Sequence, residues 1–118
     1  MTVKECYERL EADYDDMLSR LGDDMIIERF LLKFPSDVSM QNFLEAYNQK
    51  DIEAMFRGVH TLKGVVGNMS FTKLQECAVV ITEKLRPRTQ MVEDHLVEAL
   101  IAEYDRTVQI IKEYESQI

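Results

Sequence analysis

The sequence contains little glycine, proline or cysteine. Its four glycines and two prolines are spread over 118 residues of long periodic segments, which favours an all-α fold. Cys6 and Cys77 are too few for a disulfide framework, and each lies at a helical position among apolar neighbours. There is no CxxC pair, no signal-peptide pattern and no apolar run approaching the ~18 residues of a membrane crossing. We therefore expect a cytoplasmic protein without membrane insertion.

Positive charge is in the minority. The chain has 14 Lys and Arg against 22 Asp and Glu, so its formal net charge is −8. Because this charge would repel a polyanion, nonspecific binding to nucleic acid is not expected. A hydrophobic content of 46% with 31% charged residues is typical of a globular protein, and 118 residues suit one domain. We predict a single domain over residues 1–118.

Motifs for nucleotide and metal binding are missing as well. The sequence has no Gly-rich phosphate loop, no Walker-type lysine, no HxxxH or HExxH and no Cys/His cluster. The histidine at position 95 stands alone between Asp94 and Leu96, so we interpret it as an ordinary residue near a helix start. These patterns predict a protein with no cofactor and no metal site of its own.

Apolar residues repeat at helical spacing through most of the chain. Thr2 and Glu5 form a candidate capping box for the first helix. Pro35 either kinks or divides the third periodic segment, because proline removes a backbone donor. The predicted helical segments are residues 3–12, 13–21, 24–47 (interrupted at Pro35), 52–69, 72–85 and 90–115. This pattern predicts an antiparallel four-helix bundle with one or two short additional N-terminal helices.

The segment around His60 has two different faces. Its apolar stripe faces a core and comprises Ile52, Met55, Phe56, Val59, Leu62, Val66 and Met69. The opposite stripe comprises Arg57, His60, Lys63, Gly64 and Gly67. Glycine inside a helix is less favourable than alanine by about 1 kcal/mol, so two glycines one turn apart need a reason. We infer that a large partner lies against this face and reaches His60.

The chemistry of this stripe suits phosphoryl transfer. Neutral imidazole is a nucleophile and is abundant near neutral pH. Lys63, one turn after His60, could neutralise the oxygens of an incoming phosphoryl group. Most exposed His–Lys pairs have no such role, but Gly64 and Gly67 favour the functional interpretation.

The segment from His60 to Met69, HTLKGVVGNM, closely resembles the signature of histidine-containing phosphotransfer (HPt) domains, H-x-x-K-G followed by small and apolar residues. The resemblance implies a phosphorelay intermediate, in which His60 accepts a phosphoryl group from an aspartyl phosphate on a receiver domain and passes it to another receiver domain. It further implies that Lys63 is the basic neighbour and that Gly64 is kept small for docking. We also expect Arg57 and Gly67, on the same face, to take part in receiver docking, with both glycines clearing the approach to His60.

Two further positions follow from the same resemblance. A polar residue on the next helix often supports the histidine ring in the family, and ungapped counting puts it at Thr82. The family often has glycine where this chain has Ser70, and the resemblance gives no role to that serine.

The resemblance implies response-regulator receiver domains and a hybrid sensor histidine kinase as partners. It also implies that the protein is a phosphocarrier and not an enzyme. The motif needs only a monomer. Two alternatives stay open: an HPt domain cut from a hybrid or chemotaxis-type kinase, and a non-phosphorylated helical adaptor that binds receivers. Met1 and the capped first helix favour a free-standing protein. A hydrolase with His60 as general base is less favoured, because no second catalytic group is suitably spaced.

Overall fold

Helices account for nearly the whole chain. The computed structural model describes all 118 residues and contains seven α-helices, one 3-10 helix and no strand, which confirms the all-α prediction. In chain order the elements are α1 (Val3–Leu10), α2 (Tyr14–Leu21), α3 (Asp24–Lys33), the 3-10 helix η1 (Phe34–Ser36), α4 (Ser39–Gln49), α5 (Ile52–Asn68), α6 (Thr72–Leu85) and α7 (Asp94–Ser116).

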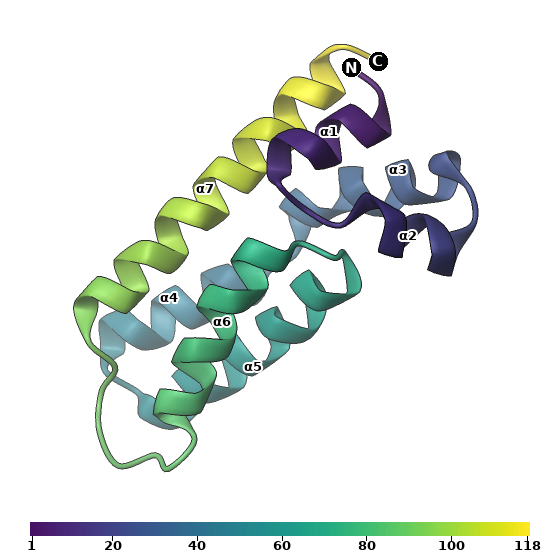
Figure 1. Cartoon of the computed structure of the whole chain (residues 1–118). Helices are drawn as coiled ribbons and strands as arrows, with labels where there is room; N and C mark the ends of the chain where they lie inside the picture. Colours follow the sequence, from purple (N-terminus) through teal and green to yellow (C-terminus); the bar gives the residue numbers. More distant parts are fainter.

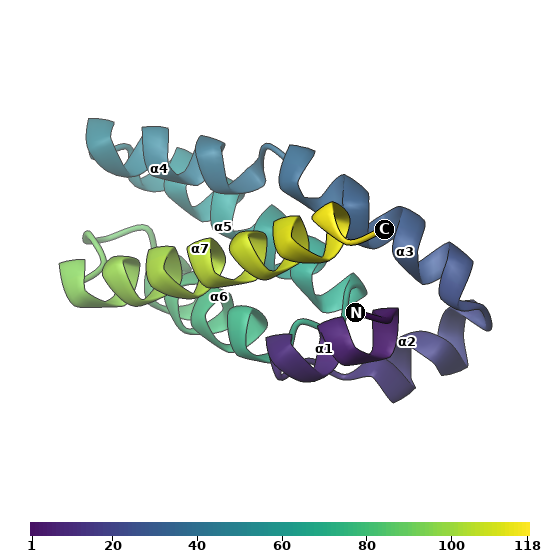
Figure 2. The same cartoon turned by 90° about the horizontal axis from the view of Figure 1, so that it is seen from above.

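The last four helices form the predicted antiparallel bundle. Helices α4, α5, α6 and α7 run in alternating directions (Figure 1). The connections from α4 to α5 and from α5 to α6 are short, whereas residues 86–93 join α6 to α7. Helix α3 approximately continues the line of α4 across η1 (Figure 2), so α1 and α2 are the two additional short helices. The N-terminal ammonium donates a hydrogen bond to Gln117 Oε1 at 3.0 Å, so the two ends of the chain lie side by side (Figure 1).

Pro35 divides the third periodic segment instead of merely bending it. Helix α3 ends at Lys33, and Pro35 lies at the start of η1, where its missing N–H group leaves no interior helical hydrogen bond unmade. The break is held by Phe34, whose buried ring packs edge-on against Phe71 at a centroid distance of 5.1 Å. A second ring contact joins Phe34 to Tyr104 of α7 at 5.8 Å.

Two predicted helix ends are wrong. The first helix ends at Leu10 rather than near residue 12, because Glu11 adopts a left-handed conformation with φ of 54°. The last helix begins at Asp94 rather than at residue 90 or 91. The connection between α6 and α7 is therefore longer than expected, and Val92 within it is buried in the core. Burial of an apolar residue outside the helix cannot be distinguished by periodicity from burial inside it.

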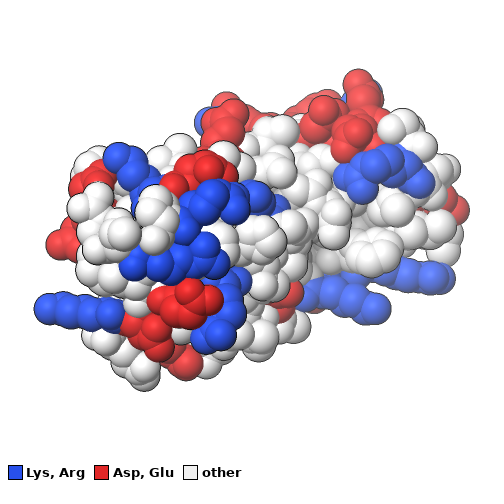
Figure 3. Space-filling model, turned by 90° about the horizontal axis from the view of Figure 1, so that it is seen from below, with Lys and Arg blue, Asp and Glu red and all other residues white.

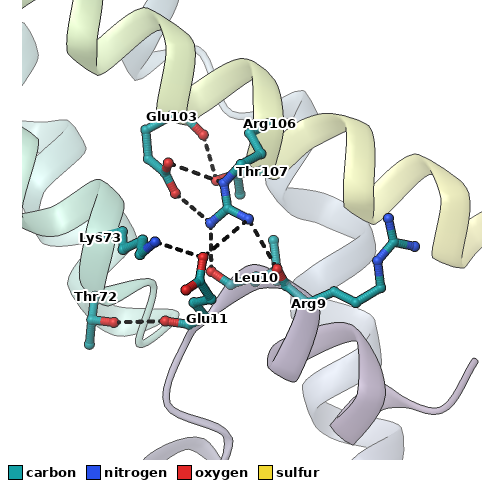
Figure 4. Close-up of polar contacts among 8 residues, drawn as sticks. All are labelled: Arg9, Leu10, Glu11, Thr72, Lys73, Glu103, Arg106 and Thr107. Atoms are coloured by element: carbon teal, nitrogen blue, oxygen red, sulfur yellow. Dashed lines mark hydrogen bonds and ion pairs between the residues drawn. The ribbon is translucent and has the colours of Figure 1, made fainter.

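A cluster of charged side chains fastens the end of α1 to α6 and α7 (Figure 4). Arg106 of α7 donates to the carbonyl oxygen of Leu10 at 2.8 Å and forms an ion pair with Glu103. A cation at this position satisfies carbonyl groups that a helix end leaves without partners. Lys73 of α6 binds Glu11 at 2.6 Å, and this hydrogen bond lowers the pKa of the Glu11 carboxyl. The cluster thereby fixes α1 against the bundle.

Helices α4 and α5 approach each other closely at Gly58, a residue to which the sequence analysis gave no role. A Cβ atom at Gly58 would lie 3.0 Å from Cα and 3.1 Å from N of Phe43. These are backbone atoms of α4, so they cannot rotate away as the end of a flexible side chain can. Gly58 is therefore required by the packing distance between the two helices.

We expect Gly58→Ala to destabilise the protein by about 1–3 kcal/mol, because the added methyl group must push α4 away from α5. Gly64→Ala is the matched control: it lies on the same helix, and its Cβ would meet no atom within 4 Å. That control should be neutral or slightly stabilising, because alanine favours helices. Urea denaturation measures both variants. Equal midpoints for Gly58→Ala and the parent would contradict the packing role of Gly58.

Candidate functional site

Helix α5 has a buried side that packs into the core and an exposed side that carries His60. It begins after Asp51, whose carboxylate accepts a hydrogen bond from the backbone N–H of Ala54 at 3.1 Å. The residues that face the core are completely buried: Met55, Val59, Leu62 and Val66. His60 is exposed on the opposite side, together with Arg57 and Gly64. Burial of one stripe therefore fixes the outward direction of the other.

The His60 ring rests on the helix that carries it. It is stacked on the Phe56 ring, one turn earlier, with centroids 5.6 Å apart and an angle of 26° between the planes. The His60 imidazole makes no hydrogen bond to another protein group, and only backbone hydrogen bonds of α5 involve this residue. Lys63, on the next turn, is half-buried and forms no ion pair. The imidazole nitrogens are thus free of protein partners and a cation lies one turn away.

Basic side chains surround this part of the molecule although the whole chain is acidic. Arg86 and Arg88 both lie over the Phe56 ring, with their guanidinium carbons 5.5 and 3.6 Å from its centroid. The Arg86 hydrogen bonds to Glu83 are the largest cause that lowers the pKa of this carboxyl, and Lys63 adds to the effect. Figure 3 shows Lys and Arg side chains interspersed with Asp and Glu at the left end, which is the end of the bundle with the α6–α7 connection. Arg86 is paired with Glu83 and Arg88 with Glu53, so the cations beside His60 that have no ion-pair partner are Arg57 and Lys63. Such cations suit a phosphoryl group.

The two glycines of the exposed stripe differ in their surroundings. Gly64 is exposed, and a Cβ atom there would meet nothing within 4 Å, so it leaves the surface beside His60 bare. Gly67 is half-buried, and a Cβ atom there would lie 2.6 Å from Nε2 of Gln75 on α6. The expectation that Gly67 clears the approach to His60 is therefore corrected: Gly67 makes room for a side chain of the neighbouring helix.

Thr82 does not reach the imidazole. Its side chain is completely buried, and its hydroxyl donates a hydrogen bond to the carbonyl oxygen of Ala78 at 2.7 Å. The predicted support of His60 by Thr82 is wrong, because the Thr82 side chain is buried in the core and forms no hydrogen bond with the exposed imidazole. The ring contact with Phe56 takes this place instead.

A largely apolar hollow lies between the last turns of α5 and α3, and it was not predicted from the sequence. It has a volume of about 230 Å³ and is lined by Val65 and Met69 from the α5 side and by Phe30 and Phe34 from the α3 side. Phe30 is 48% exposed, although the spacing of apolar residues in residues 24–34 placed it on the core side. The core side of α3 consists of Ile27 and Leu31. An excess of apolar residues on every side of this short helix was the available signal.

Ser70 forms a polar link between the α5–α6 turn and α2. Its φ of 56° lies in the left-handed region, which glycine adopts without strain. Its hydroxyl donates to Asp16 Oδ2 at 2.5 Å and accepts from Arg20 Nη2 at 2.8 Å. Its carbonyl oxygen accepts from the Asp13 N–H group at 3.0 Å. Serine at this position is more strained than glycine would be, but its hydroxyl forms hydrogen bonds to α2 that glycine cannot form.

We expect Ser70→Ala to lower the free energy of unfolding by about 1–2 kcal/mol, because it removes hydrogen bonds to charged groups and keeps the left-handed strain. Ser70→Gly loses the same bonds but relieves strain of about 1 kcal/mol, so it should be the milder change. Thermal unfolding measures the order. Ser70→Ala with the stability of the parent would contradict the link.

The same link predicts a pH dependence. The hydrogen bond from Ser70, followed by that from Arg20, holds the pKa of Asp16 below its usual value. A lowered carboxyl pKa contributes stability above the unfolded-state pKa, and this stability is lost as pH falls through the folded-state value. The difference in thermal stability between the parent and Ser70→Ala should therefore be constant above about pH 5 and shrink as the pH falls below the ordinary Asp pKa of about 3.9.

None of the helices has the length and apolar character that a membrane crossing needs. No three His, Cys, Asp or Glu side chains are grouped so that they could hold a metal ion. Fold and site together define a class of protein: a small helical bundle that carries an exposed histidine on one helix, with a lysine on the next turn.

The family model of the Hpt domain matches residues 5–110 of the chain. The protein therefore belongs to the Hpt domain family, whose members are phosphocarriers, and this membership implies phosphotransfer in two-component signalling. Comparisons with curated proteins and with solved structures gave no match.

Proposed function

We propose that the protein is a phosphorelay intermediate in which His60 accepts a phosphoryl group from the aspartyl phosphate of one receiver domain and passes it to another. The observation that carries the proposal is the placement of His60: exposed on α5, free of protein hydrogen bonds, and next to the open surface at Gly64. Family membership supports the phosphoryl group as cargo.

The transfer needs one bond to form and one to break. The lone pair of an imidazole nitrogen of His60 attacks phosphorus as the bond to the receiver's aspartyl oxygen breaks, and its electron pair returns to that carboxylate. The other ring nitrogen keeps its proton. Lys63 lies one turn away and neutralises charge on the phosphoryl oxygens. Transfer to the next receiver is the same step in reverse, so this chain supplies the nucleophile and each receiver supplies its own acidic site.

The docking face extends from Arg57 past Gly64 to the hollow beside Phe30. Arg57 is exposed on the side of α4, where a depression of about 260 Å³ lies on the surface along the contact between α4 and α5. The exposed apolar area at Phe30 is typical of protein contact surfaces. We assign Arg57 and Gly64 to receiver docking, and we leave Gly67 out because it faces Gln75. Response-regulator receivers and a hybrid sensor histidine kinase are the proposed partners, in the cytoplasm, with residues 1–118 acting as one monomeric domain.

The proposal is tested by incubation with a receiver domain that carries labelled aspartyl phosphate. We expect the label to move to this protein and to be lost in acid but retained in base, as a phosphoramidate on histidine should be. Peptide mapping should place it at His60. A receiver that binds tightly without any movement of label would favour the adaptor alternative instead.

A further inference from the structure

The connection between α6 and α7, residues 86–93, passes the first turns of α5 (Figure 1). Arg88 within it is held at three points. Its backbone N–H donates to the Leu85 carbonyl oxygen at 2.9 Å, its Nη1 donates to the Arg86 carbonyl oxygen at 2.7 Å, and its Nε binds Glu53 on α5 at 3.1 Å. The Arg88 side chain is therefore fixed relative to α5 although it belongs to an irregular segment.

This fixed guanidinium lies directly against Phe56. Its carbon is 3.6 Å from the centroid of the ring, the separation of a close cation–aromatic stack. Phe56 is only 8% exposed, so its ring is enclosed by the guanidinium above it and the core below it. Arg88 thus restricts the motion of a ring that would otherwise border solvent.

The same ring supports His60. Because Thr82 uses its hydroxyl within α6 and no other protein group forms a hydrogen bond with His60, the stacked Phe56 ring is the contact that sets the plane of the imidazole. In-line attack on phosphorus requires a nitrogen of that plane to point at the incoming group, and small errors in such an orientation slow a reaction strongly.

We propose that Arg88 is a positioning residue for His60 and acts through Phe56: the guanidinium holds the phenyl ring, and the phenyl ring holds the imidazole. This inference rests on the proposed phosphotransfer at His60. It assigns a role in the reaction to the α6–α7 connection, outside the HxxKG segment.

The test compares the parent with Arg88→Ala and Arg88→Lys. Alanine removes the flat cation, whereas lysine retains the charge without the planar face. All three residues at position 88 must adopt the left-handed conformation seen at φ of 57°, so backbone strain is similar among them. Arg9→Ala is the matched control, because Arg9 also forms one exposed ion pair, with Glu113 at 2.5 Å, but on α1 and away from Phe56.

Two measurements are made on each protein. The first is the rate at which phosphoramidate, a small donor that needs no docking face, phosphorylates His60, followed by ³¹P NMR. The second is the set of NOE contacts between the His60 and Phe56 rings in the unphosphorylated protein. We expect Arg88→Ala to react about five- to tenfold more slowly with weakened ring contacts, Arg88→Lys to lie in between, and Arg9→Ala to match the parent.

An unchanged rate in Arg88→Ala overturns the positioning role, whether or not the ring contacts survive. Ring contacts of parental strength overturn it as well, because the effect would then not pass through Phe56. If the parent itself acquires no phosphate at His60, the proposed function fails. The NOE contacts would still decide separately whether Arg88 holds the two rings.

Discussion

Replacing His60 with glutamine should abolish acid-labile phosphorylation of the protein while leaving the bundle folded. Glutamine is similar in size and polarity, but its amide nitrogen is not a nucleophile toward phosphorus. The His60 side chain is exposed and makes no protein hydrogen bond, so the change should affect the free energy of unfolding by about 0.5 kcal/mol or less. Label transferred from a phosphorylated receiver, measured after base treatment, should fall to background.

His95→Gln is the matched control for this experiment. His95 is the second and last histidine of the chain, and it is also exposed, on the first turn of α7. It lacks the stacked aromatic ring and the bare neighbouring surface of His60. The control should carry as much label as the parent. Loss of label in His95→Gln together with retention of label in His60→Gln would contradict the proposal, because it would place the phosphoryl group on α7 instead of α5.

Gly64→Leu should slow transfer from a phosphorylated receiver by about 10- to 100-fold, because a 1 Å misplacement of reacting groups can have an effect of this size. A Cβ at Gly64 meets no atom within 4 Å, so the leucine side chain would extend from α5 one turn after His60, into the space that the receiver must occupy. Leucine also favours helix over glycine, so the bundle should remain folded. The defect therefore belongs to docking and not to folding.

The design of this experiment separates access from chemistry. Phosphoramidate is small enough to reach His60 past a leucine, so Gly64→Leu should react with it at close to the parental rate. Gly64→Ala should lie near the parent with both donors, because one methyl group blocks little of the surface. A parental rate of transfer from the receiver to Gly64→Leu would remove the docking role that we give to this glycine.

The features that the sequence predicted correctly are those that depend on a single helix. The spacing of His60, Lys63 and Gly64 puts them on one side of α5 whatever the neighbouring helices do, because helical geometry alone decides it. The break at Pro35 is similarly local, since the missing N–H group acts within its own turn. The division into four long and two short helical units followed from the same periodicity.

The features that could not be predicted from the sequence depend on which side chains or backbone atoms of an adjacent helix lie nearby. Gly58, Gly64 and Gly67 are the same type of residue, yet Phe43 lies against Gly58 and Gln75 lies against Gly67. Thr82 was placed by counting along the chain, but the rotation of α6 turns its side chain inward. Helix rotation and separation are set by packing among many residues, and a single sequence without structural context does not specify them.

Tyr7, Asp13 and Asp16 reach the end of α5 from the other end of the chain. Tyr7 donates to the Met69 carbonyl oxygen across 62 positions, and Ser70 reaches Asp16 across 54. Helices α4 to α7, in contrast, pack against their immediate neighbours in sequence. A contact between residues far apart in sequence closes a long loop, and the chain loses conformational entropy when the loop closes. We therefore expect α1 and α2 to join after the folding transition state. Helix α5, which carries His60, would then pack into the bundle before α1 and α2 attach to its end. Loss of the Ser70 link would therefore mainly accelerate unfolding.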